Sequence, residues 1–259
     1  MTVPPADPAV VARLRAAGCV FAEDEARLLT AAASTPGQLA ALVDQRVAGL
    51  PLEQLLGWAE FCGLRIIVGP GVFVPRRRTE LLVRAAIAQA RPEPVVVDLC
   101  CGSGAVGAAL AAVLDIAELH ASDVDPAAVA CARQNLPVGR VHQGDLFEPL
   151  PDVLRGRVDL LVANVPYVPS DAIPLMPPEA RDHEPRVSLD GGPDGLDVAR
   201  RVVAAAPSWL AAAGSLLFET SEAQVPAAVA AVTAAGLLPA VVADEELGAT
   251  VVVGTARYS

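Results

Sequence analysis

The chain has 259 residues, of which 53% are hydrophobic and 3% aromatic, so it can bury a sizeable core and disorder is not expected. The length suits one large domain, or one medium domain with a small one. The net charge of −11 disfavours tight non-specific binding to nucleic acid without excluding a protein substrate.

The cysteines and the first residues indicate a cytoplasmic protein without metal. The spacing of the five cysteines fits no metal site, and their odd number favours reduced thiols. The segment MTVPPADPAV lacks the features of a signal peptide, and there is no apolar run of about 20 residues, so no membrane helix is expected. The cysteines are Cys19, Cys62, Cys100, Cys101 and Cys131.

The first third of the chain predicts two small units. Residues 6 to about 50 have helical spacing, and Asp7 followed by Pro8 is a typical helix start. Residues 1–58 are predicted to be a small N-terminal helical domain. Residues 59–78 contain two β-rich runs around Gly69-Pro70-Gly71, which predict a connecting β-hairpin. A helix is then expected to begin near Thr79, a candidate cap.

Residues 79–259 alternate between strand and helix patterns. Seven strands are predicted, and the last two resemble a hairpin, which suggests one antiparallel strand. Alternation of this kind indicates right-handed βαβ units and a mostly parallel sheet with helices on both faces. The predicted class is α/β, with a Rossmann-like, seven-stranded, mostly parallel sheet. The gap from Val168 to Gly195 is rich in proline, glycine and charge, and a loop of that length is usually functional or disordered.

The stretch VVVDLCCGSGAVG predicts a strand, a glycine-containing turn and a helix. In an open parallel sheet, ligands bind beyond the carboxyl ends of the strands. The spacing D-x-C-x-G-x-G differs from that of a dinucleotide pyrophosphate site. It fits a ligand with a carboxylate end whose ammonium group faces an acid. The predicted cofactor positions here are Asp98, Cys100, Cys101, Gly102, Ser103 and Gly104.

The next two strands end in further acids. Asp123 is suited to hold a ribose diol. Asp145 could face an adenine amino group, with Leu146 against the ring. Taken singly, an acid at a strand end is often only a helix cap. Three such features in order, after strands one, two and three, indicate S-adenosylmethionine.

The fourth predicted strand ends in the loop Asn164-Val165-Pro166-Tyr167. An amide nitrogen is a poor nucleophile, and an enzyme can help by accepting hydrogen bonds from its N–H groups. The Asn164 side-chain oxygen and the Val165 carbonyl are such acceptors. Pro166 stiffens the turn, and Tyr167 can pack on the planar group. The alternative is a strand that ends in a proline turn, with Tyr167 in the core.

With these residues in view, the chain resembles the protein-(glutamine-N5) methyltransferases of the HemK/PrmC type, whose signature loop reads Asn-Pro-Pro-Tyr. The resemblance implies a class I methyltransferase fold, S-adenosylmethionine as cofactor, and a release-factor Gly-Gly-Gln loop as substrate, docked with help from the helical domain. The matching blocks are PLEQLLG, VFVPRRRTELLV, DLCCGSGA, NVPYVP, HEPRVSLDGGPDGLDVARRV and GSLLFETSEAQ.

The chain departs from the family pattern at three places. Cys100 replaces the first glycine of the turn, so its backbone must keep φ negative or accept strain. Val165 replaces the first proline of the signature loop. The C-terminal segment reads LGATVVVGTAR, without the Gly-Arg-Asp-Arg-like run that is common in the family.

Several charged and histidine residues carry open alternatives. His183-Glu184-Pro185 is either part of a substrate lid or a solvated loop. The Arg76-Arg77-Arg78 run either pairs with cofactor or an acidic substrate, or is a solvated helix start. His120 and His142 are expected in the sheet, without metal. Glu80 and Glu219 are expected to be structural acids lining the site.

Three functions remain as hypotheses. The first is methyl transfer to a glutamine amide of a protein. The second is N-methylation of a nucleic-acid amine, because nucleic-acid N-methyltransferases share the Asn-Pro-Pro-Tyr loop. The net charge of −11 disfavours this hypothesis. The third is a non-catalytic, cofactor-binding module, with Val165 as a sign of decay.

Overall fold

The computed structural model describes residues 6–257. The first five residues, which belong to the segment read for a signal peptide, lie outside the described residues. The N-terminal helices pack around a small apolar core that includes Leu14, Leu29 and Val43. The Asp7 side chain accepts a hydrogen bond from the Ala9 N–H, which confirms the predicted helix start. The helices are α1 (Pro8–Ala16), α2 (Ala22–Ala32), α3 (Pro36–Val47) and α4 (Leu52–Leu56).

The connector contains the predicted hairpin, but its turn lies elsewhere. Strands β1 (Trp58–Phe61) and β2 (Leu64–Ile67) are antiparallel and are joined by Cys62-Gly63. Both turn residues have positive φ, +50° and +73°, which suits the twist of a two-residue hairpin. The prediction that the hairpin turns at Gly69-Pro70-Gly71 was wrong, although these residues do form a turn, closed by the Val72 N–H bonding the Gly69 carbonyl at 3.2 Å. That segment leads into extended chain, where the Gln54 side chain bonds the backbone.

The main sheet has the order β5-β4-β3-β6-β7-β9-β8. Strands β3 to β7 pair in parallel, and β9 is antiparallel to both of its neighbours, so the predicted α/β fold is confirmed. The chain proceeds outward from β3 to β5 and returns to the other side of β3 with β6, which creates a switch point there. The strands are β3 (Val95–Leu99), β4 (Glu118–Asp123), β5 (Arg140–Gln143), β6 (Val158–Ala163), β7 (Leu210–Thr220), β8 (Leu238–Asp244) and β9 (Ala249–Thr255).

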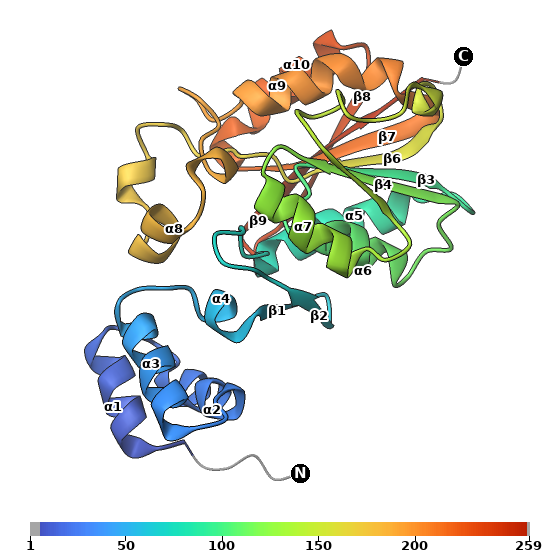
Figure 1. The fold of residues 1–259 in the computed structure, drawn as a ribbon. Helices are drawn as coiled ribbons and strands as arrows, with labels where there is room; N and C mark the ends of the chain where they lie inside the picture. Colours follow the sequence, from blue (N-terminus) through green and yellow to red (C-terminus); the bar gives the residue numbers. More distant parts are fainter. Residues whose placement is uncertain (1–5, 258–259) are drawn as a thin grey trace.

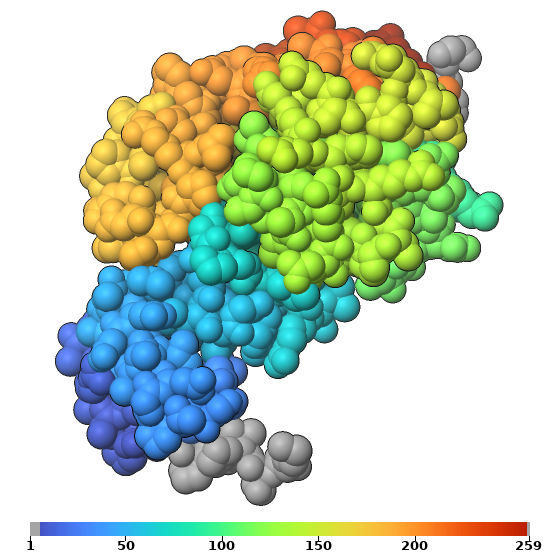
Figure 2. Space-filling view, in the orientation of Figure 1, coloured from blue at the N-terminus to red at the C-terminus, as the bar shows by residue number. Residues whose placement is uncertain are grey.

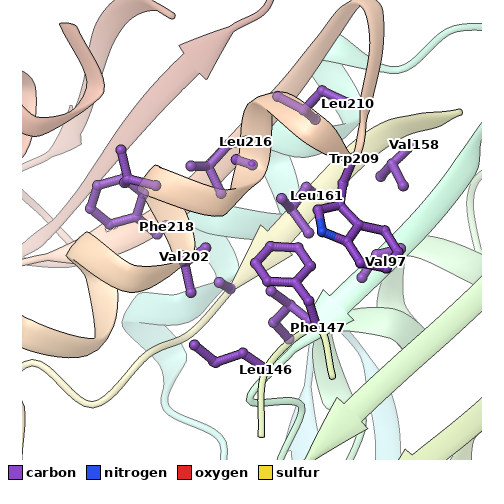
Figure 3. Close-up of a cluster of buried hydrophobic side chains, with 14 of the residues drawn as sticks. Val97, Leu146, Phe147, Val158, Leu161, Val202, Trp209, Leu210, Leu216 and Phe218 are labelled. Carbon is purple, nitrogen blue, oxygen red and sulfur yellow. The ribbon is translucent and has the colours of Figure 1, made fainter. Parts of the chain in front are cut away.

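Helices cover both faces of this sheet: α9 and α10 lie on one face, and α5, α6 and α7 lie on the other (Figure 1). The central strand β3 is buried along its whole length, as a strand covered on both faces requires. In the core beneath α9, the rings of Phe147 and Trp209 stack with centroids 5.2 Å apart (Figure 3). The helices are α5 (Glu80–Gln89), α6 (Ala105–Ala111), α7 (Pro126–Asn135), α9 (Asp197–Ala205) and α10 (Val225–Ala234).

Helix α5 begins after a single 3₁₀ turn, Arg77–Thr79. Thr79 occupies the residue before α5, but its side chain does not cap the helix. The hydroxyl donates instead to the Glu219 carboxylate. The sequence-based prediction of a Thr79 cap was therefore wrong, because a buried acid on β7 competes for the same hydroxyl.

The segment 168–195 is a folded insertion, although its sequence suggested a loop. It contains helix α8 (Pro178–His183) and the short turns Ile173–Leu175 and Arg186–Ser188. The Glu184 side chain is buried, accepts a hydrogen bond from the Val74 N–H, and pairs with Arg76 at 2.6 Å. This rules out the solvated-loop alternative for Glu184.

The insertion also contacts the N-terminal helices (Figure 2). Arg46 of α3, which is only 7% exposed, pairs with Glu25 of α2 at 2.7 Å and with Glu179 of α8 at 2.5 Å. Since a buried guanidinium needs partners, these two acids tie the insertion to the helical region. Across residues 6–257, no helix is both long and apolar enough to cross a membrane, and no group of three or more acid, cysteine or histidine side chains could hold a metal ion.

Candidate active site

A cavity of about 340 Å³ lies at the switch point, beyond the carboxyl ends of the parallel strands. Every cofactor and loop position predicted from the sequence lines it except Gly104. The wall is completed by the connector and the insertion, which contribute Phe73, Arg76 and Val187 among others. The topology therefore brings together three acidic strand ends and the loop after β6.

The turn after β3 has three residues with positive φ: Cys100 (+53°), Gly102 (+54°) and Gly104 (+78°). Cys100 thus accepts the backbone strain that a glycine would avoid. A Cβ added to Gly102 would meet no atom within 4 Å, so the space over the turn is open. Gly104 instead packs toward α7, and a Cβ added to it would lie only 3.0 Å from Leu136 Cδ1.

Asp98, at the end of β3, is a buried carboxylate that lines the cavity. Burial raises the pKa of this carboxyl to about 7, although the Gly107 N–H donates to it at 2.9 Å and opposes the rise. A buried acid facing a cavity is suited to a cationic ligand group, because a cation would stabilise its ionised form.

Asp123, at the end of β4, binds the turn directly. One carboxylate oxygen accepts from the Gly102 N–H at 2.8 Å and the other from the Asp125 N–H at 2.9 Å. Burial raises its pKa, and these backbone donors counteract the rise. Each oxygen keeps a free lone pair, so Asp123 can shape the turn and still accept from a ligand hydroxyl.

The residues after β5 are arranged differently from the sequence-based prediction. The strand ends at Gln143, and Leu146 has a φ of +49°. Its carbonyl accepts from the Ser122 hydroxyl at 2.7 Å, so its side chain is held in the cavity wall. Asp145 pairs with Arg201 of α9 at 2.5 Å, a partner that the sequence did not indicate.

In the loop after β6, Asn164 lines the cavity and, among residues 6–257, its side chain makes no hydrogen bond to the protein. Val165 is 1% exposed, and its side chain packs in the core with Leu99 and Phe218. Pro166 is buried. The loop therefore presents a free amide to the cavity and anchors itself through Val165.

Tyr167 is held at both ends. Its hydroxyl donates to Glu219 at 2.7 Å, and its carbonyl accepts from the Gln224 side chain at 2.9 Å. The Arg78 guanidinium lies 5.4 Å from the ring centroid. Burial, the Glu219 charge and its hydrogen bond raise the pKa of the Tyr167 phenol, so the hydroxyl stays protonated as a donor.

Comparison with known proteins identifies the family. The Methyltransferase small domain family matches residues 63–174. A release factor glutamine methyltransferase of Geobacter sulfurreducens is 39% identical over 85% of this chain and 78% of its own. A release factor glutamine methyltransferase of Mycolicibacterium smegmatis is 40% identical over 86% of this chain and 82% of its own. The chain belongs to the release factor glutamine methyltransferase family.

This methyltransferase shares its fold with one chain in the structure of the E. cuniculi Mtq2–Trm112 complex, which is responsible for methylation of the eRF1 translation termination factor. The TM-score is 0.52 and the identity 22%, covering 72% of this chain and 99% of that one.

As a family member, the chain is an S-adenosylmethionine-dependent enzyme. The cavity fits that cofactor in two respects. The space over Gly102 is open, and Asp98 is a buried acid that an ammonium group would satisfy.

The structure adds two residues to the site of this methyltransferase that sequence reasoning missed. Gln224 fixes the Tyr167 carbonyl and also donates to the Asp194 carbonyl at 2.9 Å. Its sequence signals were its place in the matching block GSLLFETSEAQ and a capping box with Ser221, and neither assigns it a role in the site. Gly195 lies against the same carbonyl, where a Cβ would be 2.3 Å from the Tyr167 oxygen.

Gly195→Ala is expected to destabilise the enzyme more than Gly236→Ala. Both glycines have positive φ, +76° and +81°, but only Gly195 lacks room for a Cβ. Backbone strain alone costs about 1–2 kcal/mol, so Gly236→Ala should lose that amount. Gly195→Ala should lose at least about 2 kcal/mol more, because Tyr167 and Gln224 must separate. Urea unfolding followed by tryptophan fluorescence measures both; equal losses would contradict the contact.

Proposed function

We propose that this chain transfers a methyl group from S-adenosylmethionine to the side-chain amide nitrogen of the glutamine in a Gly-Gly-Gln loop of a peptide chain release factor. The observation that carries the proposal is the free Asn164 amide beside the Val165 main chain at the cavity. Relatives about 40% identical over most of the chain, named for that activity, support the substrate.

The cofactor is proposed to lie along the ends of the first three parallel strands. Asp98 would pair with its ammonium group, and Asp123 would accept from its ribose. Leu146 would pack on the adenine, beside the Asp145–Arg201 pair. When bound, S-adenosylmethionine supplies an electrophilic methyl group. The turn residues proposed to contact it are Cys100, Cys101, Gly102 and Ser103, whereas Gly104, also predicted from the sequence, packs against Leu136 outside the cavity.

The substrate amide is proposed to bind at the loop after β6. Asn164 Oδ1 and the Val165 carbonyl would each accept one N–H of the glutamine amide. Those hydrogen bonds strengthen as the nitrogen becomes positive, so they favour the transition state over the ground state. Tyr167 would support the planar amide, and Pro166 would limit the motion of the loop. The transfer would leave S-adenosylhomocysteine, and the proton lost from the methylated nitrogen would pass to solvent. Positioning and electrostatics supply the catalysis, with no separate general base.

Val165 is compatible with this chemistry. Its side chain is in the core, while the proposed acceptor is its carbonyl, which any residue provides. Proline at this position would fix φ, whereas valine relies on packing to hold the backbone. The replacement therefore retains the acceptor and is no sign of decay.

The division into residues 1–58, 59–78 and 79–259 is proposed as docking domain, connector and methyltransferase domain. The separate cores around Leu14 and around the main sheet support it. The helical region would help dock the release factor in the cytoplasm. A nucleic-acid substrate is disfavoured by the net charge of −11.

The experiment is to incubate the enzyme with labelled S-adenosylmethionine and a panel of release factors, with RNA and DNA as further arms. Label on a release factor supports the proposal. Label only on nucleic acid would favour an N-methyltransferase of nucleic acids. Cofactor binding by calorimetry, with no labelled product in any arm, would favour a non-catalytic module.

Cofactor affinity is expected to rise with pH. With a pKa of about 7, the Asp98 carboxyl is mostly protonated at pH 6 and mostly ionised at pH 8, and only the ionised form attracts an ammonium group. Calorimetry should therefore show tighter binding at pH 8 than at pH 6, by up to about tenfold. In Asp98→Asn, binding should be weaker and should not improve as the pH rises. An equal pH dependence in both proteins would show that Asp98 is not the titrating group.

A further inference from the structure

Glu219 of β7 is a buried carboxylate for which the proposed chemistry has no direct use. It is 2% exposed and lines the cavity at the acceptor end. Oε1 accepts from the Tyr167 hydroxyl at 2.7 Å and forms an ion pair with Arg78, whose Nε lies 3.0 Å away. Oε2 accepts from the Thr79 hydroxyl at 2.7 Å. One side chain thus joins β7, the loop after β6 and the turn before α5.

This arrangement fixes the orientation of the Tyr167 ring. A tyrosine side chain has two main torsions, so holding its hydroxyl on β7 restricts both. The Gln224 bond to the Tyr167 carbonyl restricts the backbone of the same residue. A hydrogen bond to a charged acceptor is worth about 1.5–3 kcal/mol, more than a bond between neutral groups, which favours a single ring position.

The charge of Glu219 has a second consequence, through Arg78. The Arg78 guanidinium lies 5.4 Å from the Tyr167 ring centroid, close to where the acceptor nitrogen would gain positive charge. An unpaired cation there would oppose that charge. Pairing with Glu219 offsets it, so the carboxylate both orients the ring and neutralises its cationic neighbour.

We propose that Glu219 is a positioning residue for methyl transfer, acting by holding the Tyr167 ring and neutralising Arg78 at the acceptor end of the cavity. This inference rests on the proposed function, because the transfer reaction is what the positioning serves. Thr79 contributes through the second carboxylate oxygen, at the expense of capping α5.

The kinetic test compares Glu219→Gln, Tyr167→Phe and the double variant on a release factor. Each single change is expected to lower kcat at least about tenfold, because each removes the same charged hydrogen bond. Calorimetric affinity for S-adenosylmethionine should stay within about twofold of wild type. The double variant should lose no more than the worse single variant. A loss of kcat in the double variant equal to the product of the two single losses would overturn the proposal, as would an unchanged kcat in Glu219→Gln.

Arg84→Gln is the matched control. Arg84 pairs with Asp244 at 2.6 Å outside the cavity, so its loss removes an arginine–carboxylate pair without touching the site. Its kcat should match wild type. If Glu219→Gln fails to fold, Thr79→Val and Tyr167→Phe test the two carboxylate oxygens separately, and both should lower kcat with cofactor affinity kept.

A second readout is independent of activity. The chain has two tyrosines, so ring signals of tyrosine-labelled protein can be assigned with Tyr167→Phe. In Glu219→Gln the Tyr167 ring signals should shift towards those of an unrestrained ring. Unshifted signals would overturn the positioning role. If the wild-type enzyme transfers no methyl group to any release factor, the proposed function is contradicted instead. The ring signals would still decide whether Glu219 holds Tyr167.

Discussion

Asn164→Ala is expected to lower kcat for release-factor methylation by about 10²- to 10³-fold, the usual cost of losing a positioned transition-state hydrogen-bond partner. The Asn164 amide lines the cavity and is not used by other described residues, so its removal should disturb little else. The affinity for S-adenosylmethionine should change far less than kcat, because the cofactor is proposed to be held mainly by the three strand ends before this loop.

Single-turnover kinetics and calorimetry together separate these effects. Gln134→Ala serves as the control, since Gln134 is an exposed amide on α7 whose side chain bonds only within its own helix. Its kcat should equal that of wild type. A modest loss in Asn164→Ala, comparable with the control, would mean that the amide acceptor lies elsewhere.

Asp123→Ala is expected to weaken S-adenosylmethionine binding by about 10²-fold, since a ribose hydrogen bond to a charged acceptor is worth about 1.5–3 kcal/mol. The carboxylate holds Gly102 and Asp125 in place and is proposed to accept from the ribose. Its loss therefore removes a ligand contact and loosens the turn that carries the other contacts.

Asp159→Ala is the matched control for this variant. Asp159 also accepts a backbone N–H, from Val95 at 2.9 Å, but at the opposite end of β3. It should lower stability and leave cofactor affinity unchanged. Equal affinity in Asp123→Ala and wild type, measured by calorimetry, would contradict the assignment of the cofactor to these strand ends.

The sequence was sufficient to predict the sheet and the positions that surround the cavity. Strand periodicity and the Asp7 cap depend on neighbouring residues, and the structure confirms that the Asp7 side chain bonds the Ala9 N–H. The acids after β3 and β4 could be placed together because parallel strands end at one edge of a sheet. Such features follow from local pattern and fold class.

The sequence was insufficient where distant segments compete for the same group. Thr79 looked like a cap until a buried acid 140 residues away took its hydroxyl. Asp145 forms an ion pair with Arg201, and Glu184 forms one with Arg76, in each case with a residue far away in the sequence. The arginine run therefore pairs with the protein's own acids at Arg76 and Arg78. Partners of this kind depend on packing, which no local pattern records.

The central claim is that a glutamine amide of a release factor accepts the methyl group. The most direct measurement is peptide mass spectrometry of one release factor after incubation with wild-type enzyme and, in parallel, with Asn164→Ala. The expected result is the added mass of one methyl group on the glutamine of the Gly-Gly-Gln peptide with wild type, and its near absence with the variant. A methyl group on another residue, or equal labelling by both proteins, would contradict the account.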